Sequence, residues 1–284
     1  MNIAIITPTF RRDLRRCEFL CQSVDRFVEE SIEHYLIVDR RDVSLFQSLL
    51  TSRRKLLISE EILPRWLFRM PGSRRWWISL RSFPVRNWIL QQILKLSINI
   101  HVKTDVYMFV DSDVFFIKPL ERNTYVCDDK ARLFRVPGGG QGGRHQMWNR
   151  SAGTLLGLEL KDYYGSDFIG NMITWRRDTL EDLQMRIKSV THQQWPVALT
   201  RRLHFSEYIL YGVFSEFVQG NDNRHFFDSK NLCHCSWDYN IGNRKELSIF
   251  LSRIETHHNA VLIQSNLGLN VEDYIDEIER YQFI

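Results

Sequence analysis

The fold is decided by the stretch Val106-Tyr-Met-Phe-Val-Asp111-Ser-Asp113-Val-Phe-Phe-Ile-Lys118-Pro119. Its two apolar runs are short and rich in β-branched and aromatic residues, so we expect two buried strands around a break. Side chains alternate along an extended chain, which places Asp111 and Asp113 on the same side. Two acids there repel each other and carry a large desolvation cost unless a cation lies between them. The pattern predicts a Mg²⁺ or Mn²⁺ site with oxygen ligands that bridges a diphosphate; a surface turn is the alternative.

Length and composition favour one large α/β domain or two closely joined ones. The chain has 284 residues, of which 44% are hydrophobic and 25% charged, values that are ordinary for a globular protein. The formal net charge is +4, but residues 1–100 hold 17 Lys and Arg against 10 Asp and Glu. Such a basic region suits a phosphate-bearing ligand or an anionic membrane surface better than it suits a specialised nucleic-acid binder.

The sequence also bears on the cellular setting. No apolar stretch approaches the roughly 20 residues that span a bilayer, and the apolar run after Met1 is too short for a signal peptide. We therefore expect a cytoplasmic protein, with peripheral contact at the inner face of the membrane as a compatible location. The cysteine count is five, an odd number that fits reduced thiols, and neither Cys17 with Cys21 nor Cys233-His234-Cys235 has a familiar zinc spacing.

The first forty residues predict a βαβ unit. Residues 2–10 form an apolar strand that runs into a loop at Pro8, residues 19–28 have helical periodicity, and residues 34–39 form a second apolar strand that ends at Asp39. Such units build parallel sheets that bind ligands at the carboxyl ends of the strands. The loop after the first strand lacks a Gly-x-Gly-x-x-Gly motif, which disfavours a dinucleotide-binding dehydrogenase.

The Asp111-x-Asp113 motif, placed between two apolar strands, resembles the signature of glycosyltransferases of the GT-A fold. This resemblance implies an α/β fold with a GT-A-like, Rossmann-type mixed sheet flanked by helices, in a single domain over residues 1–284. Residues 1–119 would then bind the nucleotide sugar and residues 120–284 the acceptor. The resemblance further implies that Asp113, with Asp111, holds Mn²⁺ or Mg²⁺ against the diphosphate of the donor.

The resemblance also implies a set of donor-binding residues. Thr7, Thr9 and Asp39 would contact the base and ribose, and Arg11 the phosphates, although simple solvation also explains an arginine on a loop. Residues 87–97 form an amphipathic helix. Its Gln91, Gln92 and Lys95 match a Gln-Gln-x-x-Lys-Leu pattern in bacterial glycosyltransferases of polysaccharide and lipid-linked-sugar synthesis. The donor-binding residues that we predict are Thr7, Thr9, Arg11, Asp39, Gln92, Lys95, Asp111 and Ser112.

Tryptophans and arginines alternate in residues 65–88. Aromatic rings there could stack on a sugar or base while guanidinium groups, including those of Arg74 and Arg75, hold phosphates. A nucleic-acid groove and a membrane-facing basic loop are the competing interpretations. Further along, residues 137–143 contain five glycines without the ending of a Walker loop and open no obvious helix, so we expect a flexible lid.

The second half holds the predicted acceptor-side residues. Ser206 is expected to cap a helix whose first turn contains Glu207. By resemblance to inverting GT-A enzymes, Glu207 is the candidate catalytic base that deprotonates the acceptor, and a plain helix-capping carboxylate is the alternative. The same resemblance makes His234 the candidate third metal ligand. Candidate acceptor contacts are Asp167, Asn171 and Trp175, and Asp178 is expected to cap a helix over residues 179–190.

Together these observations predict a metal-dependent, inverting glycosyltransferase. Its partners would be a nucleotide-sugar donor and a glycan or lipid-linked acceptor. A nucleotidyltransferase that makes the sugar nucleotide would also use a metal-bound acid pair, but it should carry a basic glycine-rich loop where this chain has Thr7-Pro8-Thr9-Phe10. A non-catalytic protein that binds nucleic acid or membranes would explain residues 65–88 but not the acid pair at the end of an apolar strand.

Overall fold

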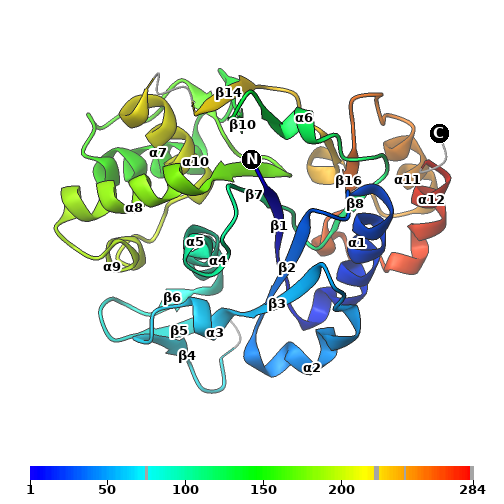
Figure 1. Ribbon diagram of the computed structural model, residues 1–284, viewed down its shortest axis with the longest axis horizontal. Helices are drawn as coiled ribbons and strands as arrows, with labels where there is room; N and C mark the ends of the chain where they lie inside the picture. The colour runs from blue at the N-terminus through cyan, green and yellow to red at the C-terminus, as the bar shows by residue number, and fades with distance from the viewer. Residues whose placement is uncertain (74–75, 221–223, 240, 282–284) are drawn as a thin grey trace.

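A five-stranded mixed sheet forms the centre of the computed structural model, which describes residues 1–73, 76–220, 224–239 and 241–281 (Figure 1). The strand order is β13-β7-β1-β2-β3, with β13 antiparallel to β7 and the other pairs parallel. The strands are β1 (Ile3–Pro8), β2 (Glu33–Val38), β3 (Arg54–Ile58), β7 (Val106–Phe109) and β13 (Ile173–Arg176). This arrangement confirms the predicted mixed α/β sheet and its βαβ opening. Arg74 and Arg75 lie outside the described residues.

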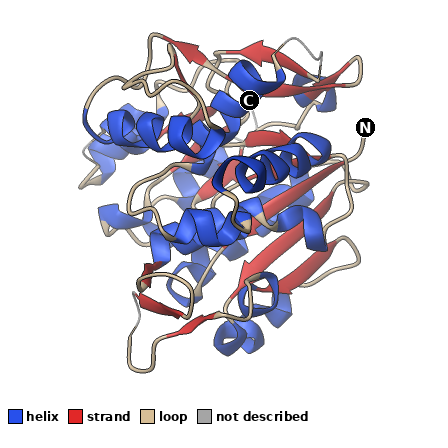
Figure 2. Cartoon of the chain, turned by 90° about the vertical axis from the view of Figure 1, so that its left-hand side faces the viewer, coloured by secondary structure: helices blue, strands red, loops and turns tan. Residues whose placement is uncertain are grey.

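Helices cover both faces of this sheet (Figure 2). Along β7, Val106 and Met108 pack into one core cluster together with residues of α1, whereas Tyr107 and Phe109 pack into another with residues of α4 and α10. The alternation follows from the period of two along a strand. The longer helices are α1 (Leu14–Phe27), α4 (Asn87–Leu96), α7 (Gly143–Leu156), α8 (Arg177–Thr191), α10 (Glu207–Phe214), α11 (Arg244–Leu251) and α12 (Ile275–Tyr281).

Shorter elements connect these layers. The short helices are α2 (Val43–Phe46), α3 (Ser59–Ile62), α5 (Ile98–His101), α6 (Arg122–Tyr125) and α9 (Trp195–Thr200). One small sheet contains β4 (Leu67–Arg69), β5 (Trp76–Ser79) and β6 (Val85–Arg86), and another contains β9 (Val126–Cys127), β10 (Lys130–Phe134) and β14 (His225–Asp228). A two-stranded sheet pairs β11 (Val136–Pro137) with β12 (Ser166–Asp167). Within the described ranges, no helix combines the length and the apolar character that crossing a bilayer requires.

The two strands predicted around the acid pair belong to different sheets. After β7 the chain turns, and β8 (Val114–Phe116) joins β16 (Ala260–Leu262) and β15 (Cys233–Cys235) in a separate sheet. The Val114 amide donates to the Asp111 carbonyl at 3.1 Å and closes the turn, while the Ile263 amide donates to the Asp113 carbonyl at 3.1 Å. The acid pair therefore occupies the point where the chain leaves the central sheet.

Two local predictions need correction. The glycine cluster does open a helix: Gly142, with φ at 75°, precedes α7, which begins at Gly143 and forms without an obvious sequence signal. Asp178 is not the cap of α8, because Arg176 is still extended and the helix begins at Arg177. Asp178 instead lies in the first turn, where its carboxylate accepts from the Thr179 amide at 2.7 Å.

Gly212 provides a test of the packing between α10 and the core. A Cβ atom at this position would lie 2.1 Å from the buried ring of Phe168. Gly212→Ala should therefore lower the free energy of unfolding by about 1–3 kcal/mol, although alanine normally favours a helix over glycine. Urea denaturation measures the change, with Ser248→Ala on the exposed side of α11 as a control that should be nearly neutral. A stabilised Gly212→Ala variant would contradict this packing.

Candidate functional site

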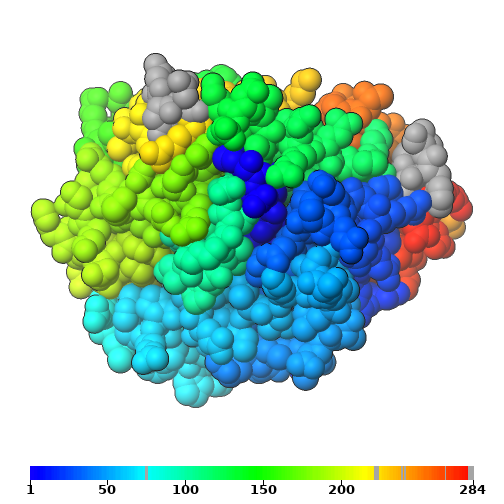
Figure 3. Space-filling model, viewed as in Figure 1, coloured from blue at the N-terminus to red at the C-terminus, as the bar shows by residue number. Residues whose placement is uncertain are grey.

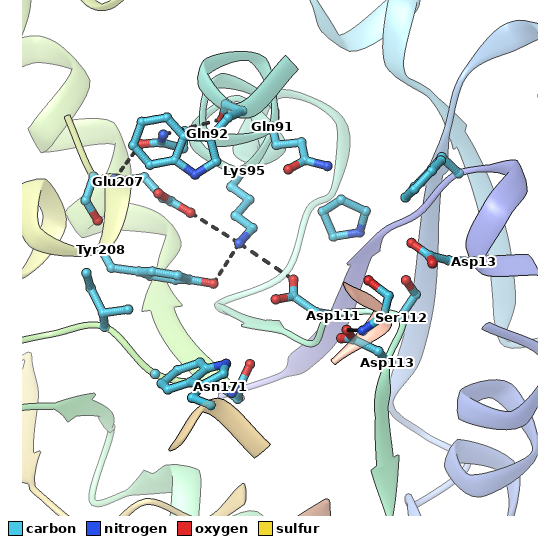
Figure 4. Close-up of a pocket in the computed structure, with 18 of the residues that line it drawn as sticks. Asp13, Gln91, Gln92, Lys95, Asp111, Ser112, Asp113, Asn171, Glu207 and Tyr208 are labelled. Carbon is cyan, nitrogen blue, oxygen red and sulfur yellow. Dashed lines mark hydrogen bonds and ion pairs between the residues drawn. The ribbon is translucent and has the colours of Figure 1, made fainter. Parts of the chain in front are cut away.

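A pocket of about 380 Å³ opens at the carboxyl ends of β1 and β7 (Figure 4). The start of α10 and one face of α4 form one wall, and the turn after β7 forms another. Ligands of open α/β sheets bind at this edge, where the strands end and the loops diverge. The side chains that line it with polar groups include those of Asp13, Gln91, Gln92, Lys95, Asp111, Ser112, Asp113, Asn171, Ser206, Glu207 and Tyr208.

The acid pair lies at the floor of this pocket. The Asp111 side chain is 49% exposed, and the Asp113 carboxylate accepts at 3.0 Å from the Ser265 amide. Burial, followed by the charge of Asp111, raises the pKa of Asp113 to about 7. Burial also raises the pKa of the neighbouring Asp13 carboxyl, against the opposing effect of Arg16. Three carboxyl groups, those of Asp13, Asp111 and Asp113, therefore line one part of the pocket.

These carboxylates fit a divalent cation that shares its coordination with a substrate. Mg²⁺ is usually held by one or two carboxylates, with phosphate oxygens and water as its other ligands. In the described part of the chain, no three or more His, Cys, Asp or Glu side chains gather into a set that could hold a metal alone. Asp111 and Asp113 supply hard oxygens, and burial, followed by the charge of Asp111, raises the pKa of Asp113.

A buried ammonium group joins the acid pair to the opposite wall (Figure 4). Lys95, on α4, donates to the Tyr208 hydroxyl at 2.7 Å and lies 3.2 Å from a Glu207 oxygen and 3.8 Å from an Asp111 oxygen. Burial alone lowers the pKa of Lys95, but Tyr208, Asp111 and Glu207 outweigh burial and hold this pKa well above its usual value. Lys95 is therefore charged at neutral pH and stabilises two carboxylates that flank the pocket.

The first turn of helix α10 places the carboxylate of Glu207 in the pocket. Ser206 is the N-cap, and its hydroxyl accepts from the Ile209 amide at 3.5 Å, as predicted from the sequence. Gln92 accepts from the Glu207 amide at 3.0 Å, so α4 also binds the first turn of α10. The Glu207 side chain is only 7% exposed and faces Lys95 in the pocket. Glu207 is thus a buried, paired acid and not a solvated capping residue.

A second pocket, of about 600 Å³, adjoins the first and shares Pro8, Phe10 and Gln91 with it. It lies beside the carboxyl ends of β1 and β2. Asp39 accepts from the Ser59 hydroxyl at 3.0 Å and forms an ion pair with Arg69. The Arg69 guanidinium stacks 4.6 Å from the Trp77 ring centre. Residues 65–88, in which tryptophans and arginines alternate, therefore form part of the wall of this pocket. The two pockets therefore lie side by side, with Pro8, Phe10 and Gln91 between them.

The structure brings most predicted site residues to these two pockets. The first pocket contains Gln92, Lys95, Asp111, Ser112, Asp113, Asn171 and Glu207, and the second contains Thr9, Arg11 and Asp39. Among the acceptor candidates, Asn171 donates to the Cys235 thiol at 3.1 Å. Asp167 lines neither pocket and instead accepts from the amides of Phe168 and Ile169 at 2.8 and 3.1 Å.

Three further predicted residues lie elsewhere. Thr7 is fully buried and bonds the His34 ring at 3.0 Å, because its side chain points into the sheet packing and not along the strand end. Trp175 is fully buried and stacks on Tyr211 with ring centres 4.8 Å apart. His234 does not reach the acid pair: its Nε2 is 2.8 Å from the Phe250 carbonyl, and its ring stacks on Phe250.

Several lining residues were not predicted from the sequence. Tyr208 follows Glu207 directly, and the polar run at residues 11–16 contains Asp13, so both had a local signal. Trp88 lies on the predicted amphipathic helix, and its ring centre is 5.9 Å from that of Trp148 at the pocket wall. Ser265 carries no signal, because only the pairing of β8 with β16 brings it near Asp113.

The Lys95–Glu207 pair predicts a measurable coupling energy. Lys95→Met should lower the free energy of unfolding by about 3 kcal/mol, because the buried Glu207 carboxylate loses its counter-ion. Glu207→Gln in the same chain should recover at least ~1 kcal/mol relative to the sum of the single changes. Urea denaturation at pH 7 gives all four values, with the exposed Lys245→Met as the control. Strict additivity would show that the two charges do not support each other.

Comparison with known proteins gives a matching family model and similar solved structures. The chain matches, over residues 1–284, the model of a family described as "Family of unknown function (DUF6492)". The crystal structure of mouse xyloside xylosyltransferase 1 in its apo form aligns with a TM-score of 0.45 and 10% sequence identity, covering 95% of this chain and 100% of that chain. A search of curated proteins found no match. Because the family model spans the whole sequence, the chain belongs to this family of unknown function (DUF6492).

Proposed function

We propose that this protein is a metal-dependent glycosyltransferase that moves a sugar from a nucleotide-diphosphate donor to a hydroxyl group. The acceptor would be a glycan or a lipid-linked saccharide. One observation carries the proposal: the acid pair at the carboxyl end of β7 lines the same pocket as Glu207 and Lys95, and this pocket adjoins the one beside β1 and β2 through Pro8, Phe10 and Gln91. This layout matches the order of base, diphosphate and sugar along a nucleotide sugar.

The nucleoside would occupy the 600 Å³ pocket. Asp39 and Thr9 line it at the ends of β2 and β1 and would bind the ribose and the base. Arg11 also lines this pocket; its guanidinium is 3.7 Å from Asp42 and its side chain is 68% exposed. A partly free guanidinium near the shared wall could turn to a phosphate, since arginine binds phosphate oxygens through paired N–H donors. The diphosphate would then lie above the acid pair.

Asp111 and Asp113 would hold the Mg²⁺ or Mn²⁺ ion. When bound, the ion supplies positive charge that stabilises the diphosphate as a leaving group. The protein's own contributions are structural. The Ser265 amide orients Asp113, and the charged Lys95 lies near Asp111 without replacing a cation, since their separation of 3.8 Å is longer than a hydrogen bond. Ser112 lines the pocket between the two acids.

Glu207 would act as the catalytic base in a single displacement. The acceptor oxygen forms a bond to the anomeric carbon as the bond from that carbon to the diphosphate oxygen breaks, and Glu207 takes the hydroxyl proton. This step inverts the anomeric configuration. The Lys95 ammonium lies 3.2 Å from a Glu207 oxygen and pairs with this carboxylate. Trp88 and Trp148, which line the same pocket, offer apolar faces on which a sugar ring could pack.

Ligand-dependent stability tests the donor site. Thermal unfolding should be measured with a panel of nucleoside diphosphates and nucleotide sugars, with and without Mn²⁺. One base should raise the melting temperature through mass action, and only when the metal is present, because the described residues include no group of three His, Cys, Asp or Glu side chains that could hold the ion alone. Asp113→Asn should abolish the shift, whereas Asp276→Asn on exposed α12 should retain it. Equal shifts in Asp113→Asn, or no shift with any nucleotide, would contradict the proposed donor site.

Product stereochemistry tests the role of Glu207. Once a donor is known, proton coupling constants of the product should report an anomeric configuration opposite to that of the donor. Glu207→Gln should lower kcat by about 100-fold or more with little change in donor affinity, since a lost general base typically costs 10²–10⁴-fold. Glu246→Gln on α11 is the matched control. Retention of configuration would exclude Glu207 as the base of a direct displacement.

A further inference from the structure

The most exposed large apolar side chains of the described residues gather at one place. Phe83, Leu203 and Leu80 are 79%, 75% and 71% exposed, more than any other large hydrophobic side chain in the described ranges. All three lie within two residues of a single contact, in which the Arg201 guanidinium donates to the Arg81 carbonyl at 3.3 Å. We call Leu80, Phe83 and Leu203 the apolar rim. Single exposed leucines are common, but three that converge indicate a contact surface.

The segments that carry the apolar rim contain no acidic residue. Residues 62–104 hold eight Lys and Arg and residues 183–206 hold four, with no Asp or Glu in either. Since the formal net charge of the whole chain is +4, the remainder of the chain has a net charge of −8. Arg81, Arg86 and Arg201 are exposed beside the apolar rim. The two sequence segments that carry the apolar rim are therefore basic, and three of their arginines are exposed close to it.

These two segments form one continuous surface. A hollow between the loop after β5 and helix α9 is lined by Leu80, Arg81, Gln194 and Arg201. In Figure 3, the cyan surface of the β4–β6 region borders directly on the yellow-green surface that contains α9. Beyond Leu203 the chain leads to the cap of α10, and beyond Phe83 it leads to Trp88 at the pocket wall. The apolar rim thus lies on the chain segments that enter the candidate site.

We propose that the apolar rim and its arginines dock the protein on an anionic lipid bilayer. Apolar side chains flanked by cations are the combination that binds the membrane interface: the rings and aliphatic chains enter the acyl boundary while the guanidinium groups pair with lipid phosphates. A protein partner would need acidic groups that face the arginines and an apolar cavity that matches the rim. An anionic bilayer presents phosphate groups and acyl chains over its whole surface. The charge complementarity therefore favours the bilayer.

Docking in this way has a consequence for the candidate site. Because residues 83–88 and 203–207 lead from the apolar rim into the pocket, the bilayer would lie beside the pocket's Trp88 side. If the protein has the proposed function, a lipid-linked hydroxyl acceptor could then reach Glu207 without leaving the membrane. The docking itself requires neither donor nor metal, so it can be tested separately from catalysis.

Vesicle flotation with the full chain tests the docking. Vesicles of phosphatidylcholine alone should be compared with vesicles that contain about 30% phosphatidylglycerol. The protein should float with the anionic vesicles and not with the neutral ones, and the bound fraction should fall as salt rises. The triple variant Leu80→Ser, Phe83→Ser, Leu203→Ser should bind at least about tenfold more weakly. Arg81→Glu with Arg86→Glu should lose binding to a similar extent.

Matched controls distinguish binding through this surface from non-specific adsorption to vesicles. Leu160→Ser with Met185→Ser removes two other exposed apolar side chains, 67% and 60% exposed, and Lys245→Glu with Arg253→Glu reverses two charges elsewhere. Both controls should bind anionic vesicles as the unchanged chain does, and circular dichroism should confirm that every variant is folded. Absence of binding to anionic vesicles, equal binding to neutral ones, or full binding by the triple variant would overturn the proposal. Binding to single-stranded RNA in place of vesicles would assign the surface to nucleic acid.

Failure of this proposal and failure of the proposed function give different results. If vesicles bind but no nucleotide raises the melting temperature, the docking surface remains and the donor assignment fails. If nucleotides bind with metal but vesicles do not, the donor assignment remains and the docking surface fails. Both measurements use the same full-length protein, and the residues changed at the apolar rim are not part of the donor site.

Discussion

The site depends on one buried ammonium group. Lys95 extends from α4 between Glu207 and Asp111, two carboxylates that come from distant parts of the chain. Without its partners, the buried Lys95 ammonium would carry a large desolvation cost. Without Lys95, the two carboxylates would repel each other. With Lys95 charged, the three groups satisfy one another, and the Tyr208 hydroxyl completes the set at 2.7 Å. The walls of the pocket are therefore joined by electrostatics as well as by packing.

Sheet topology explains why the acid pair lies beside this ammonium. Strand β7 ends at the edge where parallel strands direct their loops, and the chain then leaves for a second sheet at β8. The turn cannot be buried by further pairing in the central sheet, so Asp111 and Asp113 face the pocket. Burial, followed by the charge of Asp111, raises the pKa of Asp113 to about 7, which marks an environment that disfavours its ionised form. Strained or poorly compensated groups of this kind cluster at functional sites.

The sequence predicted what depends on local pattern. The strands around the acid pair, the helix that carries Lys95 and the Ser206 cap follow from periodicity and capping chemistry, and the structure contains all of them. Predictions that depend on contacts between distant segments of the chain were less accurate. His234 alternates to the face of β15 that packs on Phe250, and no local signal reveals which face is which. Similarly, Ser265 reaches Asp113 only because β16 pairs with β8.

The central claim is that Asp113 helps to hold a divalent metal only together with a diphosphate. Electron paramagnetic resonance of Mn²⁺ tests this directly, because the signal of the free ion falls as the ion binds. Titration of the protein should reduce this signal strongly when a matching nucleoside diphosphate is present and weakly when it is absent. With Asp113→Asn and the same diphosphate, the signal should fall no further than the diphosphate lowers it without protein. An equal reduction by the unchanged chain and by Asp113→Asn would contradict the account.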